Sequence, residues 1–272
     1  MKLFSLHVLC NVVAVTALSA VTLAAQATPQ LAATGLSTGD NNLRLNNFSG
    51  GTTYGSQWLG AQQFTYGGGS PFWAYCIDPK TSTTLPSTGY TMADLAAFMS
   101  DSAGYAGQMT SSGYTATMAA NGYGVQTNTA VVASRLRALY SYAFQDSLGN
   151  AQKAAAFGYA AWEIMGSPTA SGLSRTSGSG LLAISDGTTD GNTIAARVDQ
   201  LLTAVNTNTA AGWAAIGLNT AFSYVYTVYY DPAPHSTQNF MTARPTGISA
   251  PGTLALAGLG LLGAAFLRRR NA

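Results

Sequence analysis

The chain has 272 residues, of which only 8% are charged, and its formal net charge is +2. That charge depends on Lys2 and on three arginines near the C-terminus, so the rest of the chain is slightly acidic. This excludes a nucleic-acid partner, because no basic patch is left to contact phosphates. The low charge and the many Gly, Ser, Thr, Asn and Tyr residues favour an exported, β-rich or mixed fold over a cytosolic enzyme.

Residues 1–27 have the three-part layout of a signal peptide. Lys2 provides the positive start, an apolar run follows, and Ala25-Gln26-Ala27 offers small residues to a signal peptidase. We expect that peptidase to cleave after Ala27, and the alternative is a retained N-terminal membrane helix. Cleavage leaves residues 28–232 as one exported α+β domain, with a β-rich frame around two or three helices.

The first half of this domain carries mainly strand signals. Residues 31–56 are polar and rich in Gly, Asn and Thr, which predicts loops with short strands. Residues 57–78 have the aromatic and β-branched content of strands, with a turn at Gly67-Gly68-Gly69. Residues 92–99 favour a short helix that is capped near Thr91 with Asp94 at its third position.

The second half carries mainly helix signals. Apolar residues at helical spacing predict helices over 128–146, 151–165 and 193–205. A loop rich in Ser, Gly and Thr separates the last two. Alternating side chains over 221–231 then predict a strand, and the Pro-rich stretch 233–250 reads as a spacer.

A single hydrophobic helix is expected at the C-terminus, from Thr253 to Leu267. It would be about 22 Å long, whereas the hydrocarbon core of a bilayer is about 30 Å thick. It therefore spans a membrane only if residues from Ala250 onward join it or if the terminal arginines snorkel. Those arginines should remain cytoplasmic, which leaves the folded domain outside the inner membrane.

Pro251-Gly252-Thr253 precedes a helix rich in Gly and Leu that ends in three arginines, and this layout of residues 251–272 resembles the PEP-CTERM sorting signal of Gram-negative bacteria. The resemblance implies recognition by an exosortase-type transpeptidase and transfer to the cell surface or extracellular matrix. The family's Pro-Glu-Pro is here Ser249-Ala250-Pro251, so a simple membrane anchor remains an alternative. The residues that carry the resemblance are Pro251, Gly252, Thr253, Arg268, Arg269 and Arg270.

Few residues in the mature chain suit catalysis or metal binding. Cys10 lies in the signal peptide, so Cys76 is alone, which excludes an internal disulfide and a cysteine-based zinc site. His235 lies in the Pro-rich spacer, a poor setting for the oriented base of a catalytic triad. The loop at 186–192 lacks EF-hand spacing. We therefore expect no metal, no cofactor and no catalytic residue.

Two sequence blocks stand out around Cys76 and Trp162. Tyr75-Cys76-Ile77 is an aromatic–Cys–aliphatic block, and Ala160, Trp162 and Glu163 fit a helical Gln-x-Ala-x-Trp-Glu block. Together they resemble the thioester domain of bacterial surface proteins. In that family, a bond between the cysteine sulfur and a glutamine carboxamide gives an electrophile that surface amines attack. Trp162 is otherwise expected to be a core residue, and Glu163 part of a buried polar network.

The chain departs from that family at the glutamine of the helical block. Gly158 occupies this position, and Gln152 lies about 120° away around the helix, so it cannot replace the missing side chain. Cys76, Gly158, Trp162 and Glu163 then form a degenerate site, and we expect a free thiol at Cys76. A nearby Glu163 would disfavour the thiolate.

The expected function is non-covalent binding or a structural role at the cell surface or in the biofilm matrix, towards a ligand that the sequence does not identify. The first alternative is an adhesin that uses Cys76 in a thioester with some other glutamine and reacts with surface amines. The second is an exported enzyme with Cys76 as its nucleophile, which needs a base beside the thiol.

Overall fold

The computed structural model of this chain describes residues 29–46, 53–78, 85–110, 124–126, 128–167, 172–174, 183–184, 189–232 and 235–246. The expected signal peptide and the hydrophobic C-terminal helix, with its sorting residues, lie outside these ranges.

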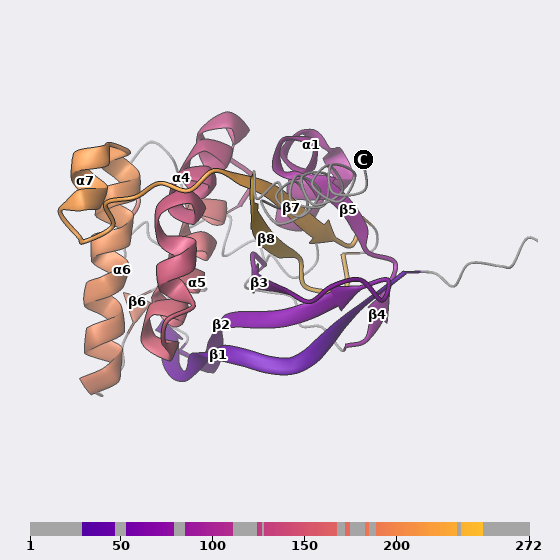
Figure 1. The fold of residues 1–272 in the computed structure, drawn as a ribbon, viewed down its shortest axis with the longest axis horizontal. Helices are drawn as coiled ribbons and strands as arrows, with labels where there is room; N and C mark the ends of the chain where they lie inside the picture. Colours follow the sequence, from indigo (N-terminus) through magenta and orange to yellow (C-terminus); the bar gives the residue numbers. More distant parts are fainter. Residues whose placement is uncertain are drawn as a thin grey trace, which may run out of the picture.

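The described strands form one eight-stranded sheet in the order β4–β1–β2–β3–β8–β7–β5, and β6 also pairs with β1. Each described pairing is antiparallel. The strands are β1 Gln30–Asn46, β2 Thr53–Tyr66, β3 Phe72–Cys76, β4 Ser87–Thr88, β5 Thr91–Asp94, β6 Ala183–Ile184, β7 Tyr224–Tyr230 and β8 Phe240–Pro245. The long β1–β2 hairpin curves under the helices (Figure 1), and three shifts in its register supply the irregularities that bend a strand pair.

The three long helices α4, α5 and α6 stand together at one end of the sheet (Figure 1). Helix α5 lies between the other two and also contacts β1 and β2. The helices are α1 Leu95–Ser100, the π-helical turn η1 Ser102–Ala106, α2 Gly107–Thr110, α4 Thr129–Ser147, α5 Ala151–Gly166, α6 Thr189–Thr207 and α7 Ala210–Ala214.

Helix α5 is the centre of the core. All of its residues from Ala154 to Gly166 are buried, as expected for a helix that is apolar on every side and covered by other elements. Its small alanines allow α4 and α6 to pack closely on both sides. Asn150 caps its start, because the Asn150 side chain accepts a hydrogen bond from the Lys153 N–H at 2.8 Å.

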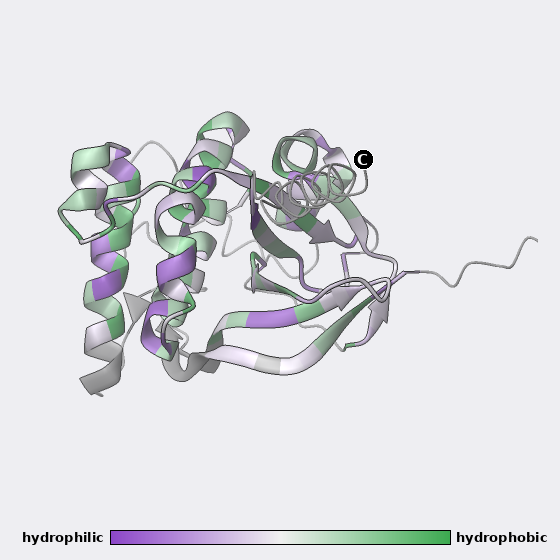
Figure 2. Cartoon of the chain, in the orientation of Figure 1, coloured by the Kyte–Doolittle hydropathy of each residue, from purple (hydrophilic) through white to green (hydrophobic). Residues whose placement is uncertain are grey.

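Hydrophobic and hydrophilic residues are interleaved along α6 (Figure 2). Within the ranges that the structure covers, none of the helices has the length and apolar character needed to cross a membrane.

Several sequence predictions are confirmed by the described residues. The architecture is α+β, and helices cover the predicted ranges 128–146, 151–165 and 193–205 with small extensions. The turn at Gly67-Gly68-Gly69 is present, with the Gly69 N–H bonded to the Tyr66 carbonyl at 3.0 Å. The strand predicted at 221–231 is β7.

Other predictions are wrong. Loops with short strands were expected over 31–56, but within that range residues 31–46 belong to one long strand that is held by its partner β2. Asp94 is the N-cap of α1 rather than its third residue, and Thr91 lies in β5. The stretch read as a spacer contains β8, whose Phe240 and Met241 are buried. More helical elements are present than the two or three expected, including the short α7.

Alkaline solution should destabilise the domain through buried tyrosines such as Tyr105. Burial raises the pKa of Tyr105 from 10.0 to about 12, and the hydrogen bond from the Gln126 N–H lowers it less. Between these values the unfolded chain binds fewer protons than the folded chain, so stability falls as the pH rises. Ionisation of Tyr105 therefore lowers the free energy of unfolding by on the order of 2 to 3 kcal/mol once the pH exceeds both pKa values.

Urea unfolding near pH 8 and near pH 11 measures about half of this loss, about 1.4 kcal/mol, because the folded chain releases the Tyr105 proton only near pH 12. The Tyr105→Phe chain should lose less stability over the same range, because it has one buried phenol fewer. An unchanged pH dependence in that variant would contradict the role given to Tyr105.

Candidate functional site

Cys76 is the last residue of β3 and is partly buried. Its Sγ donates to the Asp78 carbonyl at 3.1 Å and accepts from the Asp78 N–H at 3.3 Å. Burial raises the pKa of the Cys76 thiol well above its ordinary value, and the Asp78 carboxylate raises it further. The thiol is therefore neutral at physiological pH and a weak nucleophile towards molecules in solution.

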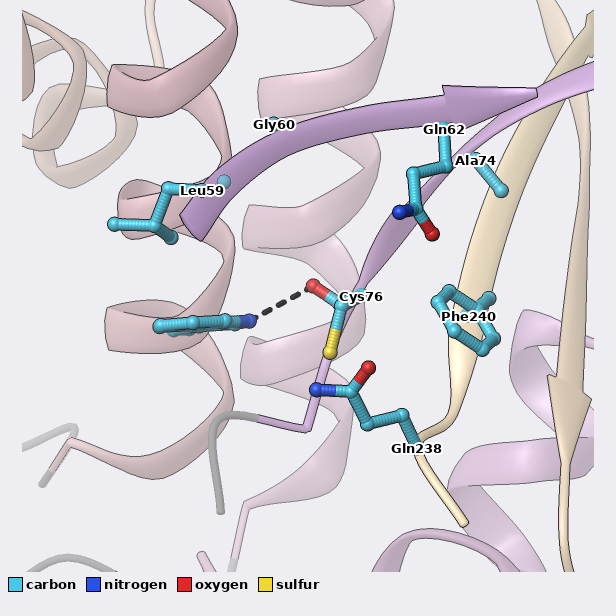
Figure 3. Close-up of a pocket in the computed structure, with 9 residues that line it drawn as sticks. Leu59, Gly60, Gln62, Ala74, Cys76, Gln238 and Phe240 are labelled. Atoms are coloured by element: carbon cyan, nitrogen blue, oxygen red, sulfur yellow. Dashed lines mark hydrogen bonds between the residues drawn. The ribbon is translucent and has the colours of Figure 1, made fainter. Parts of the chain in front are cut away.

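A small hollow of about 60 Å³ opens beside this thiol, where α5 meets three strands. Its walls come from β2, β3, α5 and the start of β8 (Figure 3). The lining residues are Leu59, Gly60, Gln62, Ala74, Cys76, Gly158, Trp162, Gln238 and Phe240. None of these nine residues is a histidine, a lysine, an arginine or a carboxylate, so the lining contains no obvious general base.

Gln238 is the residue in this hollow that the sequence analysis missed. Figure 3 shows its carboxamide pointing towards the Cys76 sulfur, and both side chains line the same hollow. The register explains this proximity, because Cys76 pairs with Phe240 in the antiparallel β3–β8 ladder. Gln238 lies two residues before Phe240, so its side chain is on the same face as Cys76 and diagonal to it.

Hydrogen bonds hold the backbone around Gln238 in place. The Tyr90 hydroxyl donates to the Gln238 carbonyl at 2.7 Å. The Ile77 N–H donates to the Asn239 carbonyl at 2.9 Å, which joins the residue after Cys76 to the residue after Gln238. The two side chains are therefore presented to each other from anchored backbone.

Trp162 reaches the same hollow from α5. Its Nε1–H donates to the Cys76 carbonyl at 2.8 Å, while its side chain is almost fully buried. Trp162 is thus a core residue, as the sequence suggested, and it also fixes the backbone of Cys76.

Gly158 and Glu163 occupy different positions relative to the thiol. Gly158 lines the hollow, and a Cβ atom added there would meet Leu59 at an ordinary contact distance of 3.4 Å. Glu163 is fully buried but does not line the hollow, and its carboxylate accepts a hydrogen bond from the Ser167 hydroxyl. Asp78, rather than Glu163, is the carboxylate that raises the thiol pKa.

Two residues that the sequence analysis considered lie elsewhere. His235 does not line the Cys76 hollow, and its ring lies against Gly107 of α2. Gln152, at the start of α5, lines a second and wider hollow of about 710 Å³ between α5, α6 and the turn that follows α7. In that hollow Asp146 pairs with Lys153 at 2.6 Å and with Arg197 at 2.9 Å.

Gln238 left little signal in the sequence. It follows two prolines and a histidine and stands just before a short strand with few β-branched residues, and this composition is typical of a linker. Only pairing with β3 shows that the stretch is part of the sheet.

Comparison with known proteins identifies the C-terminal segment. A family model for the PEP-CTERM protein-sorting motif matches residues 248–270, which supports the sorting signal predicted at 251–272. The motif implies an exported protein that is anchored in the membrane before sorting and is recognised by exosortase, a membrane transpeptidase. No curated protein and no solved structure matches the chain, and no comparison supports the resemblance to thioester domains.

Proposed function

We propose that this chain, which carries a PEP-CTERM sorting motif at residues 248–270, is a surface-binding protein that attaches covalently to amines through an internal thioester between Cys76 and Gln238. The observation that carries the proposal is the carboxamide of Gln238 in the small hollow beside the Cys76 sulfur. The proposal does not require a glutamine at position 158, because Gln238 provides the carboxamide from a different part of the chain.

The chemistry requires only these two side chains and an amine. The Cys76 sulfur attacks the Gln238 carboxamide carbon, a C–S bond forms, the C–N bond breaks, and the thiol proton leaves with the nitrogen as ammonia. An external primary amine then attacks the thioester carbon. A new C–N bond forms, the C–S bond breaks, and the proton returns to the sulfur of Cys76.

The environment of Cys76 supports a thioester that persists until it meets an amine. A thiol with a raised pKa is a poor leaving group, so the bond resists spontaneous exchange and hydrolysis. The hollow is small and part of its wall is apolar, at Leu59 and Phe240, so only a few water molecules can lie beside the bond. Only a slender nucleophile, such as an unbranched primary amine, fits a space of about 60 Å³.

The proposal treats the chain as a binding protein and not as an enzyme. A cysteine hydrolase needs a base within hydrogen-bond reach of its thiol. The lining of the Cys76 hollow supplies none for repeated turnover, whereas the proposed thioester has to form only once, between two groups that lie in the same hollow.

Non-covalent binding or a structural role at the surface or in the matrix is the second candidate. It is favoured by the wider hollow between α5, α6 and the turn after α7, whose lining combines charged groups with the amides of Asn150, Gln152 and Gln200. Such a lining offers both donors and acceptors to a polar ligand.

The intact mass of the purified full-length chain, with its termini located by peptide mapping, tests the proposal. We expect a mass short of the sequence by one ammonia, and the mass of one methylamine gained after incubation with that amine. Cys76 should resist alkylation before methylamine treatment and react after it. A plain sequence mass with an immediately alkylatable Cys76 would refute the thioester and favour the non-covalent role.

A further inference from the structure

Two buried carboxamides lie where β3 ends and β8 begins. Gln108 on α2 and Asn239 are 0% and 1% exposed. The Gln108 Nε2 donates to the Ile77 carbonyl at 2.8 Å, and the Asn239 Nδ2 donates to the Gln108 Oε1 at 2.9 Å. The backbone closes the ring, because the Ile77 N–H donates to the Asn239 carbonyl at 2.9 Å. We refer to Gln108 and Asn239 together as the amide clamp.

Chemistry fixes the orientation of both amides. The Ile77 carbonyl can only accept, so Gln108 must present its Nε2 to it and its Oε1 to Asn239. The Asn239 Oδ1 accepts from the Asp231 N–H at 2.9 Å, which leaves its Nδ2 for Gln108. A buried network that is satisfied in this way holds one geometry, because each alternative leaves a buried polar group without a partner.

The clamp acts on the two positions next to the proposed reaction partners. Ile77 follows Cys76 and Asn239 follows Gln238, while the β3–β8 ladder ends at the pair Cys76–Phe240. Beyond that pair, α2 supplies the side chain that bridges the two strand ends. The distance between the Cys76 sulfur and the Gln238 carboxamide therefore depends on Gln108, although Gln108 does not line the hollow.

We infer that Gln108 and Asn239 are positioning residues for the condensation of Cys76 with Gln238; the inference rests on the proposed thioester. An intramolecular attack needs its reacting atoms about 3 to 3.5 Å apart, and a misplacement of 1 Å costs about 100-fold in rate. Before the bond forms, the amide clamp determines how closely the Cys76 sulfur can approach the Gln238 carboxamide carbon. Once the thioester exists, its covalent bond holds the partners, so the clamp has less influence on the later attack by an amine.

Re-formation of the thioester in the full-length chain tests this inference. Incubation with ammonia reopens the bond to the original thiol and carboxamide, and removal of ammonia restarts the reaction. The Gln108→Met chain, which keeps the length of the side chain but loses both hydrogen bonds, should re-form the thioester about 100-fold more slowly. Its remaining thioester should react with methylamine within a few-fold of the wild-type rate. Intact mass measures both rates.

Gln126→Met is the matched control. Gln126 is also buried, and its Nε2 donates at 2.9 Å to two carbonyls, those of Gly124 and Gly166, away from the Cys76 hollow. It should lower thermal stability as Gln108→Met does and leave thioester formation unchanged. If Gln108→Met does not fold, Gln108→Asn replaces it; this side chain keeps the amide but is too short to reach both partners.

The outcomes separate this inference from the proposed function. A wild-type chain with a plain sequence mass refutes both. A wild-type thioester that re-forms equally fast in the Gln108 variant refutes the positioning role alone. Equal slowing in the Gln108 and Gln126 variants also refutes it, since general loss of stability then explains the effect.

Discussion

Replacing Gln238 with leucine should abolish methylamine uptake and leave Cys76 as a free thiol. Leucine has no carboxamide carbon for the sulfur to attack, so no thioester forms and no ammonia is lost. The intact mass of the Gln238→Leu chain should equal its sequence, and a thiol alkylator should modify Cys76 without prior amine treatment. We expect a complete loss rather than a reduction, because the amide of Gln62, the other glutamine of the hollow, does not lie next to the Cys76 sulfur (Figure 3).

Gln62→Leu is the matched control for this prediction. Gln62 on β2 lines the same hollow and carries the same carboxamide, but Figure 3 shows the Gln238 amide, and not that of Gln62, next to the Cys76 sulfur. The Gln62→Leu chain should keep the missing ammonia and the uptake of one methylamine. If uptake is lost in this variant and kept in Gln238→Leu, the partner of Cys76 is Gln62.

The size of the effect follows from the difference between intramolecular and bimolecular reactions. A thiol and a primary amide do not react at a useful rate in dilute solution. Fixing two groups in the correct geometry is equivalent to an effective concentration of about 10⁵ to 10⁸ M. The anchored backbone at Ile77, Asn239 and Gln238 supplies such geometry. Removal of either reacting group therefore removes the whole of this rate advantage.

Phe157→Ala should destabilise the domain more than any surface change, by about 3 to 5 kcal/mol. Phe157 on α5 is fully buried, and its ring lies 4.4 Å from that of Tyr75 and 4.8 Å from that of Tyr140. Alanine leaves a cavity that these rings cannot fill without leaving their own contacts. Urea unfolding followed by circular dichroism measures the difference, and the slope with denaturant should remain unchanged.

Phe222→Ala is the control with the same chemical change. Phe222 is 43% exposed, next to the start of β7, so its truncation should alter stability by no more than about 0.5 kcal/mol. An equal loss in both variants would show that Phe157 is not at the centre of the core. Because Phe157 packs on Tyr75, the residue before Cys76, its loss should also slow thioester formation.

The sequence by itself determined the elements whose signals are local. Apolar residues at helical spacing located α4, α5 and α6, and glycines located the turn after β2, because backbone hydrogen bonds within a helix or turn join near neighbours. The sorting segment was also readable from its own residues, and the family match covers 248–270. Cys76 was singled out by the block around it.

Only the tertiary structure decided what faces Cys76. Strand pairing joins residues far apart in the chain, and nothing in the local pattern at 233–245 specifies β3 as the partner of β8. The sequence suggested Gly158, which does reach the hollow but has no side chain to react. The antiparallel register puts Gln238 on the same face as Cys76, and the amide clamp holds both strand ends. A hydrogen-bond ladder between distant strands, rather than a contiguous motif, creates the candidate site.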